Sequence, residues 1–178
     1  MDIEKIVTEA KANQVNSDIK LVLKILSFYS PKVILEIGMD KGGTMKIWSQ
    51  AFQPDILIGI DIVKKPDEVI EIVRPNYHYL WDMNSNNLET VNKVKEILGD
   101  RKVDFLYIDG DHSRLACERD WLLYRDFVKV GGIVGIHDVL FHNRETEADI
   151  VWSNIKTLFP YSEIKTSHSS TGWGLVFV

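Results

Sequence analysis

Two short clusters of acidic and histidine side chains follow apolar runs in the second half of the sequence. The first is an Asp-Gly-Asp-His stretch from Asp109 to His112, and the second is a His-Asp pair that ends at Asp138. If both runs are neighbouring strands of a parallel sheet, about 4.8 Å apart, the two clusters lie at one edge. Asp109 and Asp138 are then close enough to hold a divalent cation such as Mg²⁺.

A metal-assisted proton transfer is the chemistry that such a set can perform. A divalent cation lowers the pKa of a bound hydroxyl group, and a neutral imidazole, here His112, can then remove the proton. His137 is an alternative base or metal ligand because it precedes Asp138. Structural roles compete with these, since Asp111 and Ser113 can cap the following helix and His112 can be a buried histidine with satisfied hydrogen bonds.

A glycine-rich loop follows the first apolar run of the chain. It spans residues 36–44 and reads Glu-Ile-Gly-Met-Asp-Lys-Gly-Gly-Thr. Glycines permit a tight turn and close approach of a ligand to the backbone, and the N–H groups of a following helix would face that ligand. The spacing differs from the G-x-G-x-x-G dinucleotide pattern because position 40 is Asp. Glu36 and Asp40 disfavour a pyrophosphate, so we expect a cationic or zwitterionic ligand beside Gly38 and Gly42.

Two acidic residues at later strand ends point to a nucleoside. Asp61 ends the second run, about twenty residues beyond the glycines, where a carboxylate can accept hydrogen bonds from both ribose hydroxyls. Asp82 follows the third run and is placed to meet the edge of an adenine, with Trp81 and Met83 on either side of the ring. Taken singly, a Gly-Gly loop can be an ordinary turn and a strand-end Asp can be a helix cap. Their joint order favours nucleotide binding.

The alternation of strand-like and helix-like runs along the chain predicts how these residues are brought together. It indicates an α/β protein with a Rossmann-like, doubly wound, seven-stranded sheet, mostly parallel with an antiparallel last strand. The last strand is expected to be antiparallel because a short Ser/Thr/Gly segment joins it to the one before. The expected strands are residues 33–37, 56–62, 77–81, 103–108, 133–136, 162–166 and 173–178, and the expected helices are 2–29, 44–52, 68–73, 88–98, 115–128 and 150–159.

Composition limits the class of protein and the partners. The 178 residues suit a single domain over 1–178, with an N-terminal helical segment over 1–30. The formal net charge of -5 makes nucleic acid an improbable partner, and no stretch is apolar enough to cross a membrane. The one cysteine, Cys117, and the absence of a signal-peptide pattern predict a cytoplasmic protein.

The order of these motifs resembles class I S-adenosylmethionine-dependent methyltransferases. Within them it is most similar to the branch of small sugar and antibiotic O-methyltransferases and cephalosporin-hydroxylase-like proteins. The resemblance covers about residues 33–178 and rests on the stretches LEIGMDKGGT, GIDI, YIDGDHS and VGGIVGIHD. It implies that S-adenosylmethionine is bound by Glu36, Gly38 and Gly42 (methionine part), Asp61 (ribose) and Asp82 (adenine), with Met83 and Asp109 beside it. It also implies that Asp109 and Asp138 bind a divalent metal and that His112 is the general base.

Two departures from the branch bear on metal use and on the substrate. Antibiotic O-methyltransferases of this kind often carry an acidic pair where this chain has His137 and Asp138, and they carry extra substrate-binding segments that this chain lacks. The acceptor pocket is therefore expected to be shaped by residues 140–149 and the N-terminal helix, with completion by a second subunit in a homodimer. His142 and His168 are expected on surface loops. The tryptophans expected in the core are Trp48, Trp121, Trp152 and Trp173, the last three alternatively forming dimer contacts.

The expected function is an S-adenosylmethionine-dependent O-methyltransferase acting on a hydroxyl group of a small molecule, a sugar or natural product, with metal assistance. One alternative is a cephalosporin-hydroxylase-like tailoring protein that uses the same fold and cofactor site. A second, from a different class, is a non-catalytic S-adenosylmethionine-binding protein. The Asp109–His112 cluster favours an enzyme, because a binding module has no need of a base beside two carboxylates.

Overall fold

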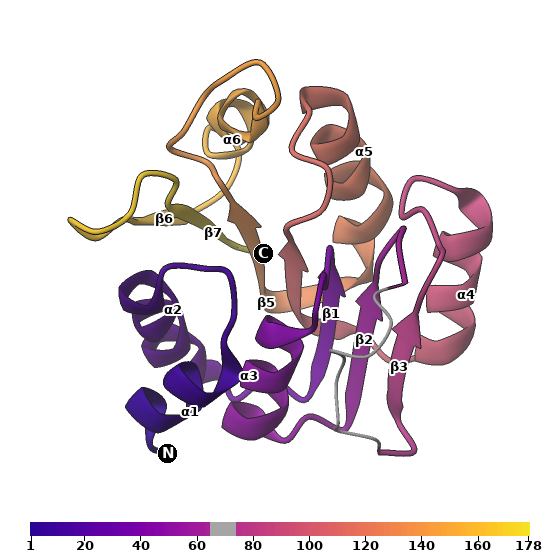
Figure 1. The fold of residues 1–178 in the computed structure, drawn as a ribbon. Coiled ribbons are helices and arrows are strands. Elements are labelled where there is room, and N and C mark those ends of the chain that lie inside the picture. The colour runs from indigo at the N-terminus through magenta and orange to yellow at the C-terminus, as the bar shows by residue number, and fades with distance from the viewer. Residues whose placement is uncertain (65–73) are drawn as a thin grey trace.

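A computed structural model describes residues 1–64 and 74–178, and these form a seven-stranded sheet between two layers of helices (Figure 1). The strand order is β3-β2-β1-β4-β5-β7-β6, and β7 runs antiparallel to both of its neighbours. The remaining pairs are parallel, which confirms the expected fold class. The strands are β1 Val33–Ile37, β2 Ile56–Ile60, β3 Tyr77–Leu80, β4 Val103–Ile108, β5 Val128–His137, β6 Tyr161–Ile164 and β7 Trp173–Phe177.

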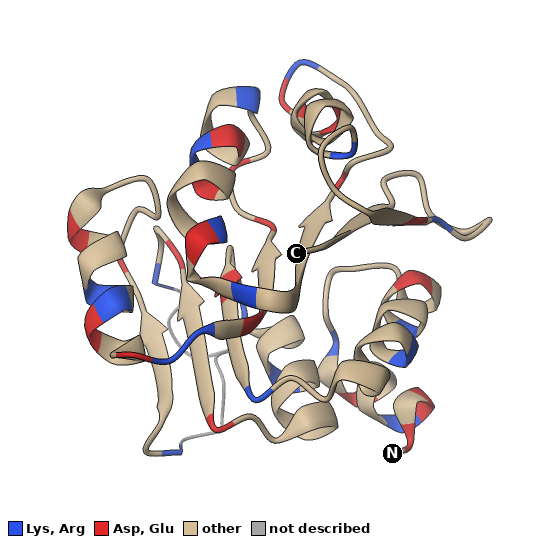
Figure 2. Ribbon diagram, turned by 180° about the vertical axis from the view of Figure 1, so that it is seen from behind, with Lys and Arg blue, Asp and Glu red and all other residues tan. Residues whose placement is uncertain are grey.

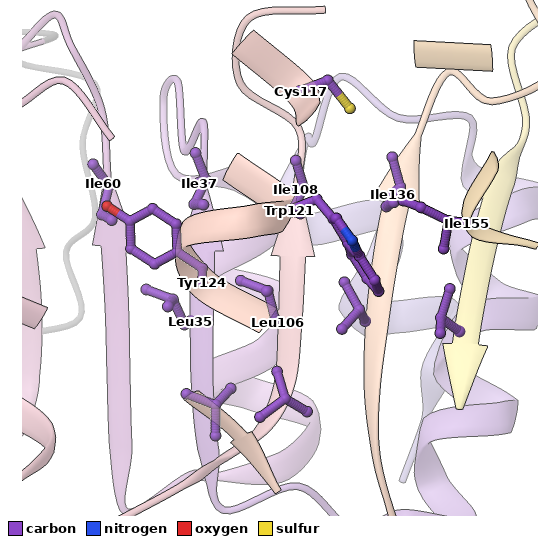
Figure 3. Packing of buried hydrophobic residues seen from close by; sticks show 14 of the residues in the cluster. Leu35, Ile37, Ile60, Leu106, Ile108, Cys117, Trp121, Tyr124, Ile136 and Ile155 are labelled. Atoms are coloured by element: carbon purple, nitrogen blue, oxygen red, sulfur yellow. The ribbon is translucent and has the colours of Figure 1, made fainter. Parts of the chain in front are cut away.

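The helices cover the two faces of the sheet because side chains alternate along each strand. Leu35 and Ile37 of β1 belong to the cluster that packs against α4, α5 and α6, whereas Ile34 faces α1, α2 and α3. Figure 3 shows Trp121 and Tyr124 of α5 within the first cluster. The helices are α1 Ile3–Ala10, α2 Asn16–Tyr29, α3 Gly43–Phe52, α4 Leu88–Leu98, α5 Arg114–Tyr124 and α6 Ala148–Ile155, with a 3₁₀ turn at Arg125–Phe127.

The single helix expected over residues 2–29 is wrong, because the chain forms two helices there. Lys11 ends α1 in the left-handed conformation, with φ 53°, and α2 begins at Asn16. The polar residues between them bond to the edge of the sheet: the Asn13 amide donates to Asp40 at 2.9 Å, and the Gln14 amide donates to Asp109 at 2.5 Å. These long-range bonds replace the helical backbone bonds that a continuous helix would have made.

Other boundaries move by a few residues. Strand β5 begins at Val128, five residues before the expected start, so the preceding helix ends earlier than expected. The sixth helix lies at Ala148–Ile155 rather than 150–159, and the helix expected over 68–73 falls outside the described residues.

The tryptophans expected in the core are buried: Trp48, Trp121, Trp152 and Trp173. No helix among the described residues has the length and apolar character that a membrane crossing requires.

Candidate functional site

The glycine-rich loop begins at Gly38, at the carboxyl end of β1. Gly38 has a φ of +86°, and a Cβ atom built on it would lie 2.1 Å from the backbone oxygen of Asp109. Its N–H donates to the Ile60 carbonyl at 2.9 Å, and the Asp109 N–H donates to the Ile37 carbonyl at 2.8 Å. The ends of β1, β2 and β4 therefore meet at a point that tolerates no side chain.

Two cavities adjoin this point and share Gly38, Asp40 and Asp109 in their walls. The histidine-side cavity has a volume of about 260 Å³ and is lined by residues 11–14, the start of α3, His112, His137 and Asp138. The Met83-side cavity has a volume of about 430 Å³ and is lined on its far side by Asp61, Met83, Asn84, Ser85, Asn86, Gly110 and Ala116. A ligand that occupied both cavities would pass directly over Gly38.

Asp61 lies in the wall of the Met83-side cavity and also holds the loops around it. Its Oδ2 accepts the Asp40 N–H at 2.7 Å, and its Oδ1 accepts the Val63 N–H at 2.9 Å. Each carboxylate oxygen has a second lone pair, so the side chain can still accept hydrogen bonds from a ligand. Asp61 therefore lies at a cavity with acceptor capacity left over, and its contact with a ribose stays a prediction.

The expected pairing of Trp81 and Met83 around a ring is wrong. Trp81 packs against the cluster that faces α1, α2 and α3, whereas Met83 packs against the cluster on the other face of the sheet. Between them, Asp82 adopts a left-handed conformation with φ 57°, which ends the alternation of the strand. Met83 lines the Met83-side cavity, whereas Trp81 and Asp82 are not among the residues that line it. Asp82 is exposed and accepts the Lys64 N–H at 3.2 Å.

Glu36 lies beneath the glycine-rich loop and is fully buried. Its carboxyl group accepts hydrogen bonds from the Thr44 hydroxyl and, at 2.5 Å, from the Trp48 indole nitrogen. Burial raises the pKa of Glu36 to about 8, although these two bonds oppose the shift. Glu36 thus anchors the start of α3 to β1, and its carboxyl group faces Thr44 and Trp48.

Four side chains at the ends of β4 and β5 form a His–Asp cluster, made of Asp109, His112, His137 and Asp138. Nδ1 of His112 lies 2.6 Å from Asp138 Oδ2, and its Nε2 lies 3.6 Å from Asp109 Oδ1. Nδ1 of His137 lies 3.1 Å from Asp109 Oδ1 and 3.0 Å from Asp138 Oδ1. The sequence analysis expected the two carboxylates to converge, and the structure brings them together around His137.

The electrostatics of the cluster favour charged histidines and a charged Asp138. The hydrogen bond to Asp138 raises the pKa of His112 above its usual 6.5. Burial alone would lower the pKa of His137, but the charge of Asp109 and the bonds to both carboxylates raise it to about 10. The Asp138 carboxyl group is partly buried, which opposes ionisation, yet the two histidines hold its pKa well below the usual range. Opposite charges therefore balance within the cluster.

Two residues that the sequence analysis missed complete the environment of Asp109. The Tyr107 hydroxyl donates to Asp109 Oδ2 at 2.8 Å, and the Gln14 amide donates to the same oxygen. Tyr107 has no local signal, since it resembles any core aromatic of a buried strand. The polar run around Gln14, in contrast, interrupts an apolar helical pattern, and that interruption was a sign of a loop that reaches the site.

Residues 140–149 do not line the histidine-side cavity, and His142 and His168 lie exposed, as expected.

The carboxylates fit a divalent cation by chemical type but do not complete its coordination. Asp109 and Asp138 present oxygens, the ligands that Mg²⁺ prefers, and one oxygen of each converges on the same imidazole nitrogen. Within residues 1–64 and 74–178, no group of three or more His, Cys, Asp and Glu side chains has an arrangement suited to a metal. A cation between these oxygens would take the place of the His137 proton and would need its other ligands from water or substrate.

Comparison with known proteins gives one family and several solved structures. Residues 35–139 match the family described as Methyltransferase domain. MycE methyltransferase from the mycinamycin biosynthetic pathway, in complex with Mg, SAH and mycinamycin VI, is similar with 16% identity and a TM-score of 0.73, over 99% of this chain and 54% of that one. An O-methyltransferase from Bacillus cereus in complex with SAH has 12% identity and a TM-score of 0.69, over 99% and 90% of the two chains.

The similarity to these solved structures shows that the fold is shared and shows no more than that, because the sequence identities are low. The chain spans about half the length of the MycE chain that it matches. No curated protein matches the sequence significantly. The family match includes the end of β1, the glycine-rich loop and both parts of the His–Asp cluster.

Proposed function

Because the chain belongs to the Methyltransferase domain family, we propose that it is an S-adenosylmethionine-dependent O-methyltransferase acting on a hydroxyl group of a small molecule. The observation that carries this proposal is the meeting of two cavities at Gly38, one bordered by the Asp61 carboxylate and the other by a histidine–carboxylate pair. Such an arrangement can place a donor on one side of the junction and an acceptor with its base on the other. The SAH and Mg in MycE, and the SAH in the Bacillus cereus protein, support the same assignment.

The Met83-side cavity suits the adenosine part of the cofactor. Asp61 offers two oxygens to the ribose hydroxyls, and Met83 offers a polarisable surface to a ring. The methionine part would cross Gly38 toward Gly43 and Thr44, where the free N–H groups at the start of α3 attract a carboxylate. In this arrangement Glu36 acts indirectly, since its bonds to Thr44 and Trp48 hold the start of that helix in place.

The histidine-side cavity suits the acceptor and its base. Since Nδ1 of His112 is bonded to Asp138, the basic nitrogen is Nε2, which lies on the Asp109 side of the ring. Asp138 orients the imidazole and stabilises the imidazolium that forms when His112 takes the hydroxyl proton. Methyl transfer itself requires alignment of donor and acceptor and removal of this proton, and the fold supplies both.

A divalent cation is the proposed assisting group, held by Asp109 and Asp138. When bound, it would lower the pKa of the acceptor hydroxyl and orient it. Mg in the MycE complex supports this part of the proposal. Nδ1 of His137 contacts both carboxylates, Asp109 and Asp138. The proton on this nitrogen and the cation are therefore alternative positive charges between the same two oxygens.

The first test is direct binding of S-adenosylhomocysteine. We expect the ligand to raise the melting temperature, because it binds the folded state only. Asp61→Ala should weaken binding by roughly ten- to a hundredfold, the equivalent of one hydrogen bond to a charged group at about 1.5–3 kcal/mol. Isothermal titration calorimetry measures both affinities. The control is Asp55→Ala, which removes a half-exposed carboxylate paired with Arg101. A wild-type protein that binds no S-adenosylhomocysteine at millimolar concentration would refute the proposed function.

The second test is metal removal. We expect EDTA to abolish methyl transfer to sugars, diols or catechols, and Mg²⁺ or Mn²⁺ to restore it, because the acceptor hydroxyl then loses its activating charge. Binding of S-adenosylhomocysteine should survive chelation, since the Met83-side cavity reaches the cluster only through Asp109. Equal turnover with and without EDTA would show that the histidines alone balance the two carboxylates.

A further inference from the structure

A buried carboxylate on α5 lies beneath the Met83-side cavity and has no part in the mechanism above. The Asp120 side chain is almost fully buried, and its Oδ1 accepts a hydrogen bond from the Asn86 amide nitrogen at 2.7 Å. Its Oδ2 lies 3.6 Å from the position of a Cβ atom on Gly110 and has no hydrogen-bond partner in the described part of the chain. Asn86 and Gly110 both line the cavity, so Asp120 supports two of its walls from below.

The bond to Asp120 determines which end of the Asn86 amide faces the cavity. An ionised carboxylate can only accept hydrogen bonds, so the amide nitrogen must point toward Asp120. The same nitrogen lies 3.3 Å from the Ser85 hydroxyl, and both contacts engage the donor end of the side chain. The acceptor end, Oδ1, is therefore the group that Asn86 can offer to a ligand in the cavity.

The loop that carries Asn86 is held firmly enough for this orientation to matter. The Tyr124 hydroxyl donates to the Ser85 carbonyl at 2.8 Å, and the Thr90 hydroxyl donates to the Asn84 carbonyl at 2.6 Å. The Asn86 N–H donates to the Asn84 side chain at 2.8 Å. With the backbone held in this way, the freedom left at Asn86 is rotation of its side chain, and the hydrogen bond to Asp120 opposes that rotation.

We propose that Asp120 is a positioning residue for cofactor specificity: it orients the Asn86 amide so that its oxygen accepts a hydrogen bond from the 6-amino group of the cofactor's adenine. The inference rests on the proposed function, because it places the adenine in the Met83-side cavity. A 6-oxo purine presents an acceptor at the same position. Two acceptors face each other in that case, and a site with a fixed hydrogen-bonding group discriminates against such a ligand.

The test compares S-adenosylhomocysteine with its 6-oxo analogue, S-inosylhomocysteine, by calorimetry at pH 8.5. Burial raises the pKa of Asp120 to about 7, so the carboxylate is mostly ionised at this pH. The wild-type protein should prefer the adenine compound by roughly tenfold or more, the effect of one unpaired polar group. Asp120→Asn should reduce this preference to within about threefold, because an asparagine can donate as well as accept and allows Asn86 to turn. Asp126→Asn changes an exposed carboxylate just beyond α5 and should keep the wild-type preference.

The outcomes separate this inference from the proposed function. If the wild-type protein binds neither compound, the proposed function fails. If it binds both equally, or if Asp120→Asn folds and keeps the wild-type preference, the role of Asp120 is refuted while the function stands. If Asp120→Asn does not fold, the test uses the double variant Asn86→Asp with Asp120→Asn. This variant again pairs an amide donor with a carboxylate acceptor, now with the two groups exchanged between the positions. It should regain the adenine preference, and a folded exchanged pair that binds both compounds equally overturns the inference.

Discussion

Replacement of His112 by alanine should lower the turnover number by roughly 10²–10⁴-fold, the usual effect of losing a general base. The acceptor hydroxyl would then lose the imidazole proposed to receive its proton, while Asp61 and Met83 stay in place. Binding of S-adenosylhomocysteine should therefore remain within a few-fold of the wild-type affinity. Turnover is measured as transfer of a labelled methyl group to whichever sugar, diol or catechol the wild-type protein accepts. The affinity for S-adenosylhomocysteine is measured by calorimetry.

The pH dependence gives a second readout of the same residue. A base must be neutral to accept a proton, so the rate should rise with pH through the ionisation of His112. A histidine ordinarily has a pKa near 6.5, but the hydrogen bond to Asp138 raises the pKa of His112, so the rising limb should lie above pH 6.5. The limb should vanish in His112→Ala. His142→Ala, which alters an exposed histidine, is the matched control and should keep it. Normal turnover with an unchanged pH profile in His112→Ala would exclude the role.

Substitution of Gly38 by alanine should destabilise the protein by about 3 kcal/mol or more and abolish cofactor binding. Two costs combine at this position. A residue with a Cβ atom is strained at φ +86°, and that atom would meet the Asp109 backbone oxygen at 2.1 Å, so β1 and β4 would have to separate. Chemical denaturation measures the loss of stability, and calorimetry with S-adenosylhomocysteine measures the loss of binding.

Gly131→Ala carries only the first of these costs, so comparison of the two variants isolates the second. Gly131 also has a positive φ, 79°, but no atom lies within 4 Å of the position of its Cβ. Its alanine variant should lose only about 1 kcal/mol through backbone strain and should bind S-adenosylhomocysteine normally. Equal stability losses in the two variants would mean that the contact between Gly38 and Asp109 is not a close one.

Much of the fold followed from local patterns. The alternating apolar runs identified all seven strands, and the short connection before Trp173 identified the antiparallel one. The positions of Asp61, Asp109 and Asp138 at strand ends sufficed to place them on one edge of the sheet. These predictions succeeded because parallel strands leave the sheet at the same edge, whatever their side chains contact.

The predictions that failed depended on contacts between distant segments. Trp81 and Met83 flank Asp82 and were expected on either side of one ring, but the chain takes a left-handed turn at Asp82 and the two side chains pack on opposite faces of the sheet. The helix over residues 2–29 breaks because Asn13 and Gln14 bond to the sheet edge, and local helix preference does not include those partners.

By itself, then, the sequence determined the sheet, the edge at which the acidic residues gather and the glycine-rich loop after the first strand. Only the tertiary structure decided which groups pair there: His112 with Asp138, His137 with both carboxylates, and Asn86 with Asp120. The reason is physical. Strand order and side-chain alternation depend on the period of the local chain, whereas the orientation of a polar side chain depends on donors and acceptors that come from other elements.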